Sequence, residues 1–305
     1  MDRSFTLDEE VRCDFIVTKE RKELWSIQLD LFDQLDRICK ENNIRYYAAG
    51  GSLLGAVRHQ GFIPWDDDMD FFMPFDDYKR FCEIAPKQLK SPYFFQDYKT
   101  TKDCTPRFAR LRNSDTTGCT IGEYDVIPPH NVGIFIDIFP LFYVPTNKNA
   151  YKLRSFMIKI LGLANGGYMV LQRKKYNKTL HLKDSFRPHI IVWRFLSLFM
   201  SHEKCCEHFL NLCDYQKEKE LLGLSSFLTG KQKYVWKAEW FDDVVRLPFE
   251  DRYIDCPKHY HEILEHQFGN YMIFVRGAAI HTMGTVDVNT PYWITFQERY
   301  GNNHC

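Results

Sequence analysis

The sequence of 305 residues lacks several features that would place it in a familiar class of protein. No apolar run reaches the roughly eighteen residues that a membrane-spanning helix needs. The ten cysteines include no Cys-x-x-Cys pair, and the N-terminus opens with Met1-Asp2-Arg3-Ser4 instead of an apolar signal segment. Forty basic side chains balance forty acidic ones, so the net charge gives no indication of a nucleic-acid partner. We therefore expect a cytoplasmic protein with reduced thiols.

The charge is nevertheless distributed unevenly along the chain. Eleven Lys and Arg residues against one Asp give residues 145–194 a net charge of +10. Aromatic and aliphatic side chains in residues 189–200 lie beside Arg187 and Arg194, a combination that is favoured at membrane interfaces. Apolar residues of this kind more often form a core. A peripheral membrane contact through residues 145–200, at the inner face of the membrane, is the alternative.

The most informative stretch of the chain runs from Tyr46 to Phe72. It predicts a short apolar strand, a turn, a short helix, and then a strand with carboxylates at alternate positions. Because side chains alternate across a strand, Asp66, Asp68 and Asp70 are expected on one face. Like charges crowded on one face repel. Oxygen ligands of this kind suit Mg²⁺, which predicts a metal site for phosphoryl or nucleotidyl chemistry.

The predicted turn carries the tripeptide Gly50-Gly51-Ser52. Glycines allow the backbone N–H groups to approach an anion closely, and the turn leads into a helix N-terminus. Gly50, Gly51 and Ser52 are therefore candidates for binding phosphate. Arg58, on the following helix, is either a bidentate phosphate ligand or a solvated surface residue.

A further carboxylate, Asp137, is expected on a second strand, because residues 133–140 are otherwise apolar, β-branched or aromatic. A buried carboxylate needs a cation or a strong set of hydrogen bonds. Strand alternation places Arg110 and Arg112 on one face of another strand and Arg107 on the opposite face.

A group of histidines and cysteines later in the chain allows two interpretations. We expect a helix whose thiols are buried, and the alternative is a zinc site. The residues concerned are His202, Cys205, Cys206, His208 and Cys213.

The order Gly-Gly-Ser, Asp-x-Asp and a later lone Asp resembles the polymerase-β-like nucleotidyltransferase superfamily. The longer string from Gly50 to Asp70 resembles the LicD family of phosphocholine transferases, with fukutin-type ribitol-phosphate transferases as more distant members. The resemblance covers most of residues 20–285. One departure is Phe268-Gly269-Asn270, where the family usually has Tyr-Gly-Asp, so donor or acceptor preference could differ.

The resemblance implies which residues act. Asp68, Asp70 and Asp137 would be the catalytic and metal-ligating carboxylates, with Asp66 and Asp67 as weaker candidates. Asp137 would also help to deprotonate the acceptor, and Arg110 matches the position that meets the donor's phosphates. The implied cofactor is Mg²⁺, with Mn²⁺ as an alternative.

The implied reaction is transfer of a phosphorylated small alcohol, such as phosphocholine, from a CDP-activated donor to a sugar hydroxyl, with release of CMP. The acceptor would be a capsule, teichoic acid or other surface glycan, or its lipid-linked precursor. Two alternatives are a nucleotidyltransferase that moves a nucleotide onto a small molecule and a catalytically dead scaffold.

The predicted fold class is α/β (α+β), with a small mixed sheet flanked by helices. We expect a catalytic core in residues 1–145 and a mostly helical part in residues 146–305. Helices are expected over residues 17–42, from Phe75 to about Leu89, and from His259 to Phe268, with breaks at Gly166-Gly167 and Pro188 in the region 149–222.

Overall fold

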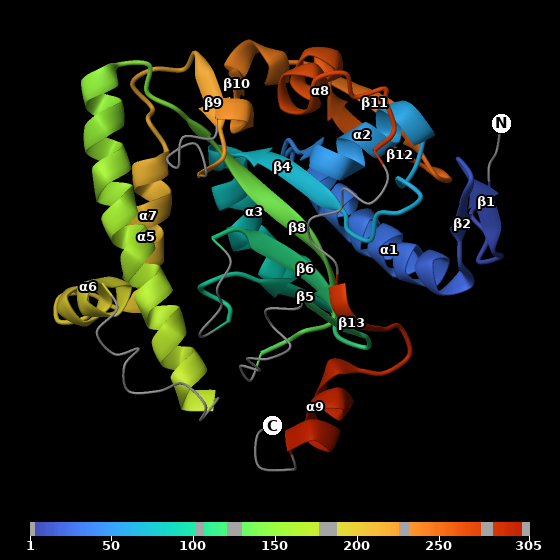
Figure 1. Ribbon diagram of the computed structural model, residues 1–305, viewed down its shortest axis with the longest axis horizontal. Coiled ribbons are helices and arrows are strands. Elements are labelled where there is room, and N and C mark those ends of the chain that lie inside the picture. The colour runs from blue at the N-terminus through green and yellow to red at the C-terminus, as the bar shows by residue number, and fades with distance from the viewer. Residues whose placement is uncertain are drawn as a thin grey trace.

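The computed structural model describes residues 4–101, 107–120, 130–176, 188–225, 232–275 and 283–300. A seven-stranded mixed sheet lies at the centre of the molecule (Figure 1). Its strands are β3 (Tyr47–Ala48), β4 (Asp70–Pro74), β5 (Tyr93–Gln96), β6 (Ala109–Asn113), β8 (Ile134–Tyr143), β9 (Leu221–Gly223) and β10 (Val235–Lys237).

The longest strand, β8, organises this sheet. Its apolar, β-branched and aromatic sequence favours a buried strand. One edge of β8 pairs in parallel with β4, and the other pairs antiparallel with β6 and then with β9. The register sets Asp70 opposite Asp137, and Arg110 opposite Asp137 from the other side. The sheet therefore brings three charged residues from distant parts of the chain into one row.

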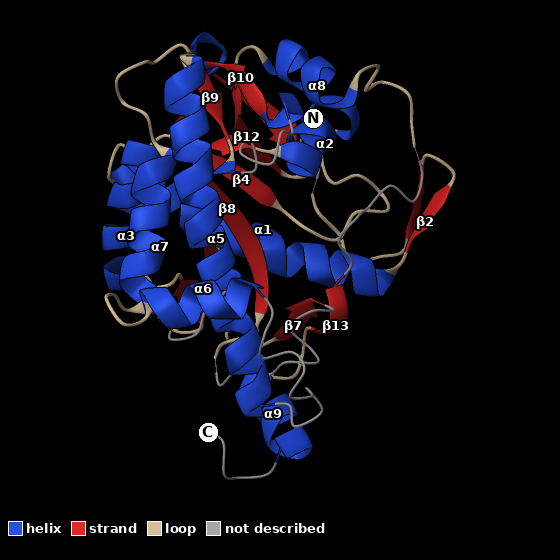
Figure 2. Ribbon diagram, turned by 60° about the vertical axis from the view of Figure 1, so that its left-hand side comes forward, coloured by secondary structure: helices blue, strands red, loops and turns tan. Residues whose placement is uncertain are grey.

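Helices α1 (Lys19–Glu41) and α3 (Phe75–Gln88) pack against the sheet. Helix α1 begins where the hydroxyl of Thr18 accepts a hydrogen bond from the N–H of Arg21, and it buries Leu31 and Leu35 in the core. A second helical group lies at one side of the sheet (Figure 2). It consists of α5 (Lys148–Tyr176), α6 (Pro188–Leu196) and α7 (His202–Cys213).

Three two-stranded ribbons complete the strands. They are β1–β2 (Glu10–Arg12, Phe15–Val17), β11–β12 (Val244–Phe249, Arg252–Pro257) and β7–β13 (Thr117–Thr120, Met283–Asp287). The remaining elements are α2 (Gly50–His59), α8 (Tyr260–Phe268), α9 (Tyr292–Tyr300) and the 3₁₀ turns η3 (Gln232–Tyr234) and η4 (Ala238–Phe241).

The structure confirms the α/β class and the predicted helices α1, α3 and α8. Strands β9 and β10, from beyond residue 145, extend the sheet that the preceding part builds. The domain boundary at that residue stays a prediction. Within the described ranges, no helix combines the length and the apolar character that crossing a membrane would take.

Three local predictions are wrong. Residues 66–69 form a loop, and β4 begins only at Asp70, because side chains of α1 bind the loop's carbonyl groups. Residues Gly50–Ser52 form the first turn of α2 instead of a separate turn. Helix α5 continues through Gly166 and Gly167 without a break. Gly167 makes room for α6, since a Cβ there would lie 2.0 Å from the carbonyl oxygen of His189.

Candidate active site

The carboxylates of the acidic stretch converge at the start of β4. Ligand oxygens of Asp66, Asp67 and Asp68 all lie within 4.8 Å of one another. Asp70 follows as the first residue of β4, opposite Asp137 on β8. Asp68 lies close enough to Asp70, Asp66 and Asp137 to interact with them electrostatically. Asp66 and Asp67, which the sequence analysis ranked lower, are the residues grouped most tightly with Asp68, and the metal-ligating roles stay a prediction.

Burial and mutual repulsion make these carboxylates hard to ionise. Burial raises the pKa of Asp68 well above its ordinary value, and the neighbouring Asp70, Asp66 and Asp137 raise it further. Burial and then Asp137 likewise raise the pKa of Asp70, while Arg110 opposes the shift. Burial, followed by Asp67, raises the pKa of Asp66 to about 6. A cluster of carboxylate oxygens in which ionisation is this unfavourable suits a divalent cation, so the residues fit the predicted Mg²⁺.

Arg110 supplies a positive charge at this cluster. Its Nε donates to Oδ1 of Asp137 at 2.7 Å, and its guanidinium lies 4.0 Å from the ring centroid of Phe135. Arg112 lies over the same ring, which confirms that the two arginines share a face. Arg112, however, is fully buried and donates to Oε1 of Gln96. Of the two, Arg110 is the one placed beside the carboxylates.

The N-terminus of α2 lies against the same cluster. A Cβ on Gly51 would be 2.5 Å from Oδ2 of Asp66, and one on Gly50 would be 3.7 Å from Oδ2 of Asp70. The backbone φ of Gly50 is +49°, which also favours glycine. The buried hydroxyl of Ser52 accepts a hydrogen bond from the N–H of Asp70 at 2.9 Å. Gly51 therefore makes room for the carboxylate of Asp66, Gly50 adopts the left-handed backbone beside Asp70, and Ser52 fixes the start of β4.

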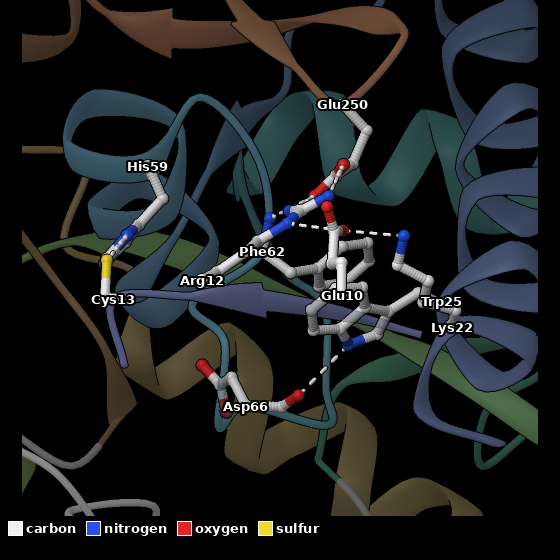
Figure 3. Close-up of polar contacts among 9 residues, drawn as sticks. All are labelled: Glu10, Arg12, Cys13, Lys22, Trp25, His59, Phe62, Asp66 and Glu250. Carbon is white, nitrogen blue, oxygen red and sulfur yellow. Dashed lines mark hydrogen bonds and ion pairs between the residues drawn. The ribbon is translucent and has the colours of Figure 1, made fainter. Parts of the chain in front are cut away.

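Side chains of helix α1 bind the backbone carbonyl groups of the loop formed by residues 66–69. The carbonyl oxygen of Asp66 accepts hydrogen bonds from Nη1 of Arg21 at 2.6 Å and from Nε1 of Trp25 at 3.1 Å. Nε2 of Gln28 donates to the carbonyl oxygen of Asp67 at 2.9 Å. Figure 3 shows the indole of Trp25 directed at the backbone of Asp66. These positioning residues were missed, because their spacing on α1 is also that of an ordinary core-facing helix surface.

A second set of contacts fixes the segment that leads into this loop. Glu250, in the turn between β11 and β12, accepts a hydrogen bond from the N–H of Phe62 at 3.0 Å. Both of its carboxylate oxygens also accept from Arg12, at 2.6 and 2.8 Å (Figure 3). A Cβ on Gly61 would lie 2.2 Å from Oε1 of Glu250. No local pattern in the sequence connects residues so far apart.

The structure does not bring Arg58 to the carboxylates. It lies at the C-terminal end of α2, where its Nη1 donates to the carbonyl oxygen of Tyr271 at 2.7 Å and its guanidinium packs on Phe274. Its neighbour His59 has its Nδ1 3.7 Å from the sulfur of Cys13, and burial lowers the pKa of His59 to about 4. These contacts hold Arg58 against Tyr271 and Phe274, and its role in phosphate binding stays a prediction.

The predicted helix with buried thiols is confirmed for α7. Cys205, Cys206 and Cys213 are buried. Nε2 of His202 lies 2.6 Å from Oδ1 of Asn165 and 3.6 Å from the sulfur of Cys206. The described contacts are those of a packed helix.

Comparison with known proteins finds a family model that covers this part of the chain. Residues 43–159 match the family model described as "LicD/FKTN/FKRP, nucleotidyltransferase domain". This range contains every predicted site residue, from Gly50 to Asp137. The resemblance to the LicD family is therefore confirmed.

Two groups of relatives are transferases by name. The chain is 26% identical over 259 residues to the lipopolysaccharide cholinephosphotransferase LicD of Haemophilus influenzae, covering 80% of this chain and 88% of that protein. It is 24% identical over 148 residues to the ribitol 5-phosphate transferase FKRP of mouse and of human, covering 48% of this chain and 28% of each relative.

Proposed function

We propose that this protein transfers a phosphorylated small alcohol, of the phosphocholine type, from a CDP-activated donor to a sugar hydroxyl of a glycan. The observation that carries the proposal is the row formed by Asp70, Asp137 and Arg110 on three adjoining strands inside the matched domain. The relatives named for cholinephosphate and ribitol 5-phosphate transfer support this reaction class.

The carboxylates of Asp68, Asp70 and Asp137 would hold Mg²⁺ or Mn²⁺, with Asp66 beside them. Such a cation would offset negative charge on the phosphoryl group and lower the pKa of an oxygen bound to it. The other contributions come from the chain itself. Arg110 would attract the donor's phosphates, and the N–H groups at the start of α2 would add positive potential on the side of Gly50 and Gly51.

The reaction would be a displacement at phosphorus. The acceptor hydroxyl attacks the phosphorus that carries the small alcohol, a new P–O bond forms, and the bond to CMP breaks. The hydroxyl proton passes to a base, for which Asp137 is the candidate. Catalysis of this kind consists of positioning and electrostatics without a covalent enzyme intermediate. The setting we propose is the cytoplasmic side of a membrane, where surface glycans or their lipid-linked precursors are modified.

Two measurements test this function. Thermal unfolding with Mg²⁺ and a panel of CDP-choline, CDP-ribitol, CDP-glycerol, CDP-ethanolamine, CTP and ATP should show stabilisation by one CDP-alcohol. Release of CMP should then require Asp70 and Asp137, and the variants Asp70→Asn and Asp137→Asn should lose it. Asp76→Asn, at an exposed acid on α3, is the matched control and should keep activity.

The alternative with support in the comparisons is nucleotidyl transfer, because the matched domain is described as a nucleotidyltransferase. The leaving group separates the two reactions. Stabilisation by CTP or ATP alone, with release of pyrophosphate, would overturn transfer from a CDP-alcohol.

A further inference from the structure

A cavity of about 650 Å³ lies among α5, α6 and α7, and its lining contains none of the acidic cluster. Its volume is within the range of small-molecule sites. Apolar side chains make up much of the lining, together with a few cationic or polar ones. The lining includes Ile158, Leu163, Val170, Phe209, Arg107 and Lys159.

Arg107 gives this apolar cavity a positive charge. Its guanidinium lies 4.2 Å from the ring centroid of Phe209, and Nη2 reaches the carbonyl oxygen of Gly162 only at 3.5 Å. Within the described ranges, no carboxylate lies within ion-pair distance of Arg107. Burial lowers the pKa of Arg107, which reflects the cost of keeping this charge away from water. A half-buried guanidinium has five donors, and the hydrogen bond to Gly162 occupies one of them at long distance, so Arg107 can bind an anion.

Two glycines on α5 keep the space beside this charge open. A Cβ on Gly162 would lie 3.5 Å from Nη2 of Arg107, and a Cβ on Gly166 would meet no atom within 4 Å. Each glycine inside a helix costs about 1 kcal/mol relative to alanine. Helix α5 continues through both glycines, so the helix has this lower stability at the positions beside the cavity.

The outer side of the cavity is apolar and basic. Lys152, Phe156, Lys159 and Leu163 follow one another at steps of four, three and four residues, which places them on one face of α5. Phe156 is 63% exposed and Leu163 is 44% exposed. Lys159 and Leu163 also line the cavity. An exposed apolar strip bordered by lysines therefore leads to the half-buried Arg107.

We propose that this cavity binds a phosphate ester that carries an apolar chain, with the phosphate at Arg107 and Lys159 and the chain along Phe209, Val170 and Leu163. A phosphate supplies the acceptor oxygens that the guanidinium lacks, and an apolar chain matches the rest of the lining. This goes beyond the proposed function and does not depend on it, since binding is measured without turnover.

The test uses the full-length protein and dodecyl phosphate below its micellar concentration, measured by isothermal titration calorimetry. We expect one site per chain. Dodecyl maltoside, which has the same chain without the charge, should bind at least tenfold more weakly, and so should inorganic phosphate, which has no chain. Arg107→Gln should weaken binding of dodecyl phosphate at least tenfold, whereas Arg107→Lys should restore part of it. Lys152→Gln, on the same helix face but outside the cavity lining, should change binding less than threefold.

A second variant keeps the test independent of the arginine. Gly166→Leu adds a side chain where no atom lies within 4 Å, so the helix should stay folded while the cavity fills and binding falls. Equal binding of dodecyl phosphate and dodecyl maltoside would overturn the proposal, as would unchanged binding by both Arg107→Gln and Gly166→Leu in folded protein.

A vesicle experiment then separates the two sources of such a group. If the natural ligand is a membrane phospholipid, cosedimentation with vesicles of phosphatidic acid in phosphatidylcholine should depend on Arg107. If it is a soluble phosphorylated amphiphile, Arg107→Gln should lose dodecyl phosphate binding while cosedimentation stays unchanged.

Discussion

Replacing Asp70 should stabilise the metal-free protein more than replacing Asp137, although the two residues are paired across β4 and β8. Neighbouring strands lie about 4.8 Å apart. Two carboxylates at about 5 Å repel by about 3 kcal/mol in an effective dielectric constant of about 20. Asp70→Asn removes this repulsion and the cost of burying the charge. We expect its free energy of unfolding to rise by about 1–3 kcal/mol at pH 7.5.

Asp137→Asn relieves the same repulsion but also breaks the contact with Arg110, whose side chain is only 8% exposed. Hydrogen bonds to charged groups contribute about 1.5–3 kcal/mol, so loss and gain should nearly cancel. The two variants should therefore differ by about 2 kcal/mol, with Asp70→Asn the more stable.

Urea unfolding in EDTA, followed by tryptophan fluorescence, measures this difference, and Asp76→Asn should give a change near zero. The pH dependence provides a second check. The pKa of Asp70 is raised in the folded state, so ionisation costs stability as pH rises from its unfolded value of 3.8. The gain from Asp70→Asn should shrink as pH falls towards 4. An Asp137→Asn protein as stable as Asp70→Asn, or a gain independent of pH, would refute the reasoning.

Three other substitutions follow from contacts elsewhere in the fold. Arg112→Gln should destabilise the protein by about 2–4 kcal/mol in urea unfolding, since it leaves buried acceptors unpaired. Arg110→Gln should cost about 1.5–3 kcal/mol by breaking the contact with Asp137, and it should also lower turnover more than Arg112→Gln does in folded protein. A larger loss of turnover in Arg112→Gln would contradict their assigned places. Glu250→Gln should lower the free energy of unfolding by about 1–3 kcal/mol, because it weakens the paired contact with Arg12. A decrease below about 0.5 kcal/mol, which is on the order of the measurement error, would argue against that contact. Burial lowers the pKa of His202 to about 4, so the unfolded state binds the proton more readily and stability should fall by up to about 3 kcal/mol as pH drops from about 6.5 to 4. His202→Phe should flatten this dependence in thermal unfolding at pH 7.5 and 5, and an unchanged slope would assign the effect to other groups.

Short-range patterns in the sequence predicted much of the site. The apolar run around Asp137 indicated a buried strand, and β8 does place that residue beside Asp70. The alternation of Arg110 and Arg112 predicted their common face, which the shared contact with Phe135 confirms. These inferences depend only on strand geometry and on the cost of burying a charge, both of which act over a few residues.

The errors arose where distant residues override a local preference. The alternating acids suggested a strand, but hydrogen bonds from Trp25 and Gln28, about forty residues earlier in the chain, hold residues 66–69 as a loop. Gly166 and Gly167 suggested a break, yet close packing of α6 requires a glycine inside a continuous helix. Periodicity carries no information about such partners.

The contact between Glu250 and the Gly61–Phe62 segment affects how far the motif from Gly50 to Asp70 indicates activity in other chains. This motif is short and contiguous, so it can be inherited or transferred as a unit. The groups that hold it in place come from α1, the first hairpin and a turn near residue 250. A chain that has the string but lacks an equivalent of Glu250 or Arg12 would carry the carboxylates without a fixed arrangement. Possession of the motif is therefore a weaker criterion for activity than possession of the motif together with its remote supports.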